Sequence, residues 1–155
     1  MSRAIQDQLT GNHCFGCGPE NADGLRIKSY WQPDDTTTCR FKPSARHCAG
    51  PAAILNGGII ATLIDCHCVC TAMAHAYQLE GRRIGTTPPI WFATGSMSID
   101  YLAPARIDGP VDLVARVREF SERKSIVTCE LNSGDEICAR AEIIAVRVPA
   151  EWSRD

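Results

Sequence analysis

The chain of 155 residues has the length of one compact domain and is too short for a second domain with its own core. Hydrophobic residues make up 45% of the chain and charged residues 22%, which excludes a disordered, collagen-like or coiled-coil protein. The formal net charge of -2 lacks the cationic excess that binding to a nucleic-acid backbone requires. We therefore predict a single domain over residues 1–155 without a nucleic-acid partner.

The beginning of the chain is polar and then rich in turn-forming residues. Its first ten residues, MSRAIQDQLT, lack the basic and then apolar pattern of a secretory signal, so we expect a cytoplasmic protein. In that compartment the nine cysteines are expected to be reduced and mostly buried. The following HCFGCGPENADG predicts an ordered loop, which makes residues 1–24 an N-terminal loop segment.

A β-hairpin and then a long helix are predicted next. Residues 25–30 alternate apolar and polar side chains, and TTTCRF at 36–41 is rich in β-branched residues, which favours two paired strands. Residues 42–55 contain prolines and glycine without a regular period and predict a loop. Beyond it, apolar residues recur every three or four positions, as on one face of a helix: Ile59, Leu63, Cys66, Cys70, Met73 and Tyr77.

The apolar segment at residues 57–77 is long enough to suggest a membrane span, but a spanning helix would have to hide Asp65, His67 and His75, so we expect no membrane partner. The two histidines are predicted to be hydrogen-bonded core or interface residues. Apolar residues also flank the helical stripe, which indicates that other elements cover the helix on most sides.

Four strand-like segments follow the helix, with short turn-rich stretches between them, and predict an antiparallel meander. A long buried helix wrapped by a curved antiparallel sheet is an α+β fold. A homodimer would protect the exposed edge strands of such a sheet.

The first turns of the helix, in LNGGIIATLID, combine the features of a catalytic site. Asn56 occupies the N-cap position, and Gly57 and Gly58 open the helix with N–H groups that lack helical partners. Such donors stabilise the oxyanion that forms during acyl transfer. Asp65, a carboxylate in an apolar helix, is a candidate general base or nucleophile. Eight residues of helix separate Gly57 from Asp65 by about 12 Å, so we expect these groups to meet across a homodimer.

LNGGIIATLID and the later ATGSMSIDYLAPAR resemble the hot-dog-fold acyl-CoA thioesterases of the 4-hydroxybenzoyl-CoA thioesterase and phenylacetic-acid-degradation type. The resemblance extends over residues 25–148, and the CFGCGPENADGL opening also recurs in this superfamily. It implies a hot-dog fold, a dimer or a pair of dimers, and hydrolysis of an acyl-CoA thioester without a cofactor.

The resemblance also implies a role for each site residue. The Gly57 N–H would polarise the thioester carbonyl, with Gly58 beside it in the substrate site. Asp65 of the partner subunit would activate water or attack the acyl carbon, and Thr94 would hold that water. Arg106 is a candidate for binding the phosphates of coenzyme A.

Two other functions stay open on the sequence. A non-catalytic acyl-CoA-binding protein is conceivable because Asn56 replaces the His that precedes the two glycines in many relatives. A hot-dog enoyl-CoA hydratase carries a His five residues after its Asp, and Cys70 in that position counts against this function.

The sequence also contains one candidate metal half-site. Cys14 and Cys17 form a C-x-x-C pair of the kind that binds zinc. Of the three cysteines on the helix only Cys66 and Cys70 share a face, so we expect the three not to complete a tetrahedral site with this loop. The sequence therefore predicts no metal site and no redox site.

Overall fold

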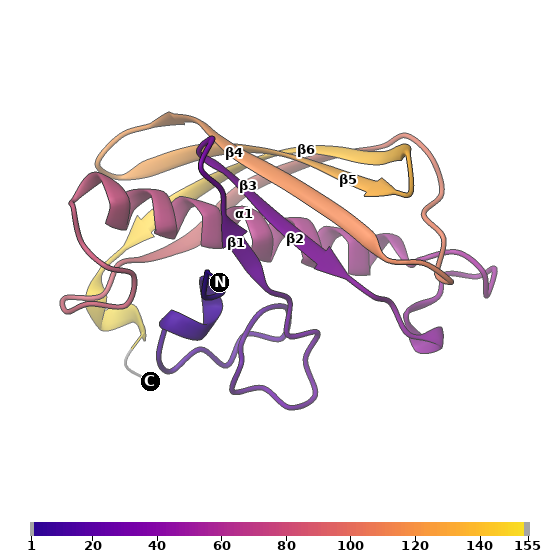
Figure 1. Cartoon of the computed structure of the whole chain (residues 1–155), viewed down its shortest axis with the longest axis horizontal. Coiled ribbons are helices and arrows are strands. Elements are labelled where there is room, and N and C mark those ends of the chain that lie inside the picture. Colours follow the sequence, from indigo (N-terminus) through magenta and orange to yellow (C-terminus); the bar gives the residue numbers. More distant parts are fainter. Residues whose placement is uncertain (1, 154–155) are drawn as a thin grey trace.

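The computed structural model describes residues 2–153 and shows one long helix lying along one face of a six-stranded antiparallel sheet (Figure 1). The sheet order is β1-β2-β4-β5-β6-β3. The predicted α+β architecture, with a sheet wrapped around a central helix, is confirmed. The elements are the helix α1 (Gly57–Leu79), the strands β1 (Ser29–Trp31), β2 (Thr36–Phe41), β3 (Trp91–Tyr101), β4 (Val111–Phe120), β5 (Lys124–Ser133) and β6 (Glu136–Val148), and the short 3-10 turns η1 (Gln6–Gln8), η2 (Ala45–His47) and η3 (Ala150–Ser153).

The predicted four-strand meander is correct for β4, β5 and β6 and wrong for β3. Strand β3 pairs with β6, so it forms one edge of the sheet and does not contact β4 as a neighbour. The reason lies in residues 102–110, which pass the start of α1 and do not turn back as a hairpin. Leu55 N donates to Ala105 O at 2.9 Å, and Ile107 N donates to Ala53 O at 3.0 Å. These bonds hold the connection against the loop that precedes α1.

The predicted hairpin is present, but its first strand is shorter than the sequence pattern indicates. Strand β1 pairs with β2 from Ser29 onward. Arg26 has φ of +55°, a left-handed conformation that cannot continue a strand, although the apolar and polar residues alternate there.

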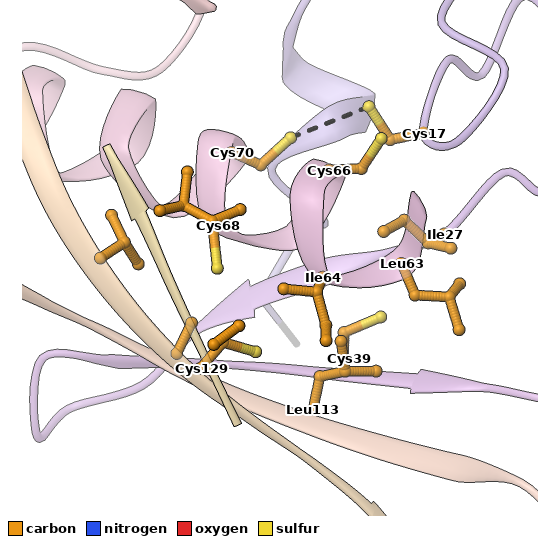
Figure 2. Close-up of a cluster of buried hydrophobic side chains, with 14 of the residues drawn as sticks. Cys17, Ile27, Cys39, Leu63, Ile64, Cys66, Cys68, Cys70, Leu113 and Cys129 are labelled. Carbon is orange, nitrogen blue, oxygen red and sulfur yellow. Dashed lines mark hydrogen bonds between the residues drawn. The ribbon is translucent and has the colours of Figure 1, made fainter. Parts of the chain in front are cut away.

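Helix α1 is buried on two opposite faces. Ile64 and Cys68 point toward the strands, whereas Cys66 and Cys70 point toward the N-terminal segment (Figure 2). The apolar stripe that predicted the helix therefore packs in part against the N-terminal segment, and the wrapping sheet covers the other face. The length and composition of α1 would suit a membrane span, yet the helix is the core of the domain, since Leu63 and Tyr77 are fully buried.

Candidate active site

The start of α1 presents one free backbone donor. Asn56 caps the helix as predicted: its Oδ1 accepts hydrogen bonds from Gly58 N at 2.7 Å and from Ile59 N at 3.2 Å. The Gly58 N–H is therefore already satisfied and is not available to a substrate. Among residues 2–153 the Gly57 N–H has no acceptor, so Gly57 carries the donor that an oxyanion could use.

Asp65 lies two turns farther along α1 and is half-buried. Thr94 Oγ1, from β3, donates a hydrogen bond to Asp65 Oδ1. Burial raises the pKa of the Asp65 carboxyl, and the bond from Thr94 opposes that shift. A carboxylate with a raised pKa is better suited to accept a proton from water than an ordinary surface carboxylate.

A β-bulge in β3 aims Thr94 at the helix. The register between β3 and β6 shifts between Thr94 and Ser96, which leaves Gly95 as the extra residue. Thr94 and Tyr101 are seven positions apart, so a regular strand would place their side chains on opposite faces. With the bulge both reach α1, because Thr94 bonds Asp65 and the Tyr101 hydroxyl donates to Gly57 O at 2.8 Å.

Gly95 is needed at this bulge because a Cβ there would lie 2.7 Å from Val146 Cγ2. Neither the bulge nor the contact of Tyr101 with Gly57 was predicted from the sequence. A glycine inside a strand pattern is the signal that could have indicated the bulge.

Gly57 and Asp65 open into different cavities of one chain. Asp65 and Thr94 line a cavity of about 510 Å³ between α1, β3 and the N-terminal segment, together with Trp91 and Trp152. Gly57 lines a second cavity, of about 380 Å³, beside Tyr101. The separation expected from helix geometry is therefore present, and a single chain does not bring the two groups to one carbonyl.

Arg106 lies at the same end of the helix as Gly57. Its backbone pairs with Ile54 in an isolated bridge just before the N-cap, and its exposed guanidinium forms an ion pair with Asp108 at 3.1 Å. Lys42, which the sequence analysis did not single out, donates to Asp108 O at 2.7 Å. Two cations thus contact Asp108, and Ala105, the residue before Arg106, lines the Gly57 cavity.

Of the two helical histidines, His67 occupies the buried, hydrogen-bonded environment that the sequence predicted, whereas His75 is partly buried and contacts aromatic rings. His67 is fully buried and hydrogen-bonded, with Ser29 Oγ 2.8 Å from Nδ1 and Thr37 Oγ1 3.3 Å from Nε2. Burial lowers the pKa of His67 to about 4, so the ring is neutral at pH 7. His75 packs edge-on against Phe120 with ring centroids 4.8 Å apart. Neither ring lines the cavity that contains Asp65.

The cysteine cluster overturns one expectation from the sequence. Two helical cysteines face the loop: Cys66 Sγ is 3.6 Å from Cys14 Sγ, and Cys70 Sγ is 4.0 Å from Cys17 Sγ. Figure 2 shows Cys66 and Cys70 on the side of the helix that faces Cys17. The sequence argument failed because it treated the three helical cysteines as one set, whereas Cys68 points to the sheet and the other two point to the loop. Of the nine cysteines, all free, seven are buried as predicted, including Cys39, Cys129 and Cys138 in the strands.

Comparison with known proteins identifies the family. The family model of the thioesterase superfamily matches residues 52–139, which is more than half of the chain. The chain belongs to the thioesterase superfamily. A search of curated proteins gives no match.

Solved structures support the assignment of this chain to the thioesterase superfamily. A thioesterase superfamily protein from Shewanella loihica PV-4 is 33% identical, with 89% of this chain and 96% of that chain covered and a TM-score of 0.68. A phenylacetic acid degradation-related protein from Ralstonia eutropha JMP134 has the same fold at 15% identity, with coverages of 84% and 92% and a TM-score of 0.66. The hot-dog fold is confirmed, and membership of the superfamily supports thioester hydrolysis as the general activity.

Proposed function

We propose that this protein hydrolyses the thioester of an acyl-coenzyme A in a site shared between two subunits of a homodimer. The Gly57 N–H of one subunit polarises the thioester carbonyl. Asp65 of the other subunit, held by Thr94, deprotonates the attacking water or attacks the acyl carbon itself. The single observation that carries this proposal is the hydrogen bond of Thr94 to Asp65, because it orients a half-buried carboxylate toward a cavity.

In this proposal the two subunits of the dimer pair through strand β3 at the edge of the sheet. It is an edge strand of eleven residues, and within the described part of the chain no strand covers its outer side. Long uncovered edges are unusual in isolated proteins and are commonly closed by another chain. Apolar side chains near this edge are also exposed: Met97 by 39%, Tyr101 by 54% and Leu102 by 51%. Pairing of two β3 strands would shield them.

The register of that pairing follows from the contacts of β3. If a two-fold axis places Ser98 opposite Ser98 of the second copy, and Gly95 is the extra residue of the bulge, Thr94 lies directly opposite Tyr101 of the second copy. Residues opposite each other in antiparallel strands share a face, with Cβ atoms about 5 Å apart. Because Thr94 contacts Asp65 and Tyr101 contacts Gly57, this register brings the carboxylate of one copy to the free N–H of the other. The β-bulge is what places both strand residues on the helix side.

The phosphates of coenzyme A would then lie at the outer end of the shared site. Arg106 and Lys42 provide two cations at Asp108, in the connection that lies against the loop before α1, and the charge of Arg106 is partly balanced by Asp108. A phosphate that displaces Asp108 from Arg106 would gain a bidentate contact.

The experiment is hydrolysis of short, medium, long and aromatic acyl-CoAs by the purified protein. Free coenzyme A is best separated by chromatography, because the nine cysteines would react with a thiol reagent. We expect release by the native protein and its loss in Asp65→Asn, whereas Asp135→Asn, in the exposed turn between β5 and β6, retains full activity. Tight acyl-CoA binding without release by the native protein would instead support the non-catalytic function. Full activity of Asp65→Asn would rule out the mechanism.

A further inference from the structure

Four cysteine side chains meet where the N-terminal segment crosses α1. The Sγ atoms of Cys14, Cys17 and Cys66 all lie within 4.8 Å of one another, and Cys14 Sγ is 3.6 Å from Cys66 Sγ. Cys70, one helical turn after Cys66 on the same face, places its Sγ 4.0 Å from Cys17 Sγ (Figure 2). None of these thiols has a role in the proposed hydrolysis.

We propose that Cys14, Cys17, Cys66 and Cys70 bind one thiophilic divalent cation such as Zn²⁺. A tetrahedral zinc site with Zn–S bonds of about 2.3 Å has sulfur atoms about 3.8 Å apart. The Cys14–Cys66 and Cys17–Cys70 pairs, at 3.6 Å and 4.0 Å, fall on either side of that distance. The Sγ of Cys70 lies outside the group of three that are all within 4.8 Å of one another, so its side chain must move toward the ion to complete the tetrahedron. The spacing also fits, since a C-x-x-C loop and a C-x-x-x-C helical turn each supply two ligands that can point to one ion. Binding releases the remaining thiol protons to solvent.

The backbone around these cysteines is shaped for close approach to the helix. A Cβ on Gly16 would lie 2.3 Å from Cys66 Sγ, so only glycine lets the loop reach that sulfur. The loop then folds back on itself, because Gly18 N donates to Cys14 O at 2.8 Å and a Cβ on Gly18 would meet Cys14 N at 2.4 Å. The two loop thiols are therefore held toward α1 by the main chain.

The surroundings favour a thiolate site over a set of apolar cysteines. Asn12 Nδ2 donates to Cys17 Sγ at 3.6 Å, the kind of N–H contact that supports a metal-bound sulfur. Cys17, Cys66 and Cys70 are buried, whereas Cys14 is exposed and gives an ion a path to the site. Soft sulfur ligands select zinc or another thiophilic metal over magnesium or calcium. The bound ion would fasten the loop that forms one wall of the Asp65 cavity.

The test is a titration of the reduced, chelator-treated full chain with Co²⁺ and then with Zn²⁺. We expect one Co²⁺ per chain, with thiolate-to-cobalt charge-transfer bands and the intense visible bands of a tetrahedral ion, and their loss when Zn²⁺ displaces Co²⁺. Cys14→Ser and Cys17→Ser should abolish stoichiometric binding. Cys48→Ser, which removes a partly exposed cysteine outside the cluster, should leave it unchanged.

Two results would overturn the proposal: no uptake of either ion by the reduced native protein, or equal uptake by Cys17→Ser. Because Cys14 is exposed, Cys14→Ser keeps the test valid even where a buried variant fails to fold. Hydrogen exchange adds a second readout, since the amides of residues 11–18 should exchange more slowly with Zn²⁺ in the native protein and not in Cys14→Ser. These measurements need no acyl-CoA, so their failure leaves the proposed hydrolysis untouched.

Discussion

A hybrid dimer tests whether the active site is shared between subunits. One chain carries Asp65→Asn, which removes the carboxylate but keeps the side-chain size. The other carries Gly57→Pro, which removes the free N–H. Proline is well tolerated at the first position of a helix, and Asn56 already has the extended conformation, with φ of −63° and ψ of 134°, that precedes a proline. The second variant is therefore expected to fold and to lose only the donor.

The expected activities follow from the geometry. Loss of a general base costs about 10²- to 10⁴-fold in rate, and loss of an oxyanion donor costs about 10²- to 10³-fold. In a shared site the hybrid dimer holds both defects in one active site and neither in the other. It should therefore regain about half of the native kcat, whereas each parent homodimer is nearly inactive.

The assay uses chains with two different affinity tags, co-expressed and purified on both tags in turn, followed by acyl-CoA hydrolysis. Gly57→Ala is the matched control, since it keeps the N–H and its Cβ would lie 3.6 Å from the Tyr101 ring, an ordinary contact. If Gly57 and Asp65 acted within one chain, every site in the hybrid would carry one defect. Activity at the level of the parents would then refute the shared site.

Three further changes have distinct expected outcomes. Thr94→Val should lower kcat by about 10- to 100-fold, because it removes a hydrogen bond to a charged group that contributes about 1.5–3 kcal/mol, and Thr94→Ser should retain most activity. Gly95→Val should lower both Tm and kcat, because the new side chain meets Val146 and displaces the bulge. The pKa of His67, lowered to about 4 by burial, predicts that unfolding free energy falls by up to about 3 kcal/mol between pH 6.5 and pH 4, since only the unfolded chain takes up the proton there.

Each of these expectations has its own check. Steady-state kinetics of Val and Ser at position 94 would contradict the role of the hydroxyl if the two variants were equally active. Thermal unfolding and kinetics of Gly95→Val would count against the bulge if both matched the native protein, with Gly109→Val, in open surface space, as the control. For His67, denaturant unfolding of the native protein and of His67→Gln across this pH range should give curves of different slope. If the unfolding free energy of both proteins changed equally with pH, protonation of the buried His67 ring would not be the cause of that change.

The sequence by itself determined the local elements of this protein and the chemistry available to them. The period of the apolar residues defined α1, Asn56 with its two glycines defined the helix cap, and Asp65 stood out as a carboxylate among apolar neighbours. These features depend on residues close together in the chain, where propensity, capping and helical period act directly.

Only the tertiary structure decided which elements meet. Strand β3 crosses to the far edge of the sheet, because the connection after Tyr101 bonds to the loop before α1 and not to its own strand. The same long-range packing brings Cys14 to Cys66, fifty-two positions apart, at 3.6 Å. A one-residue bulge turns Thr94 toward the helix. Such contacts depend on where distant backbone segments are pressed together to bury apolar surface, and no local pattern in the sequence encodes that placement.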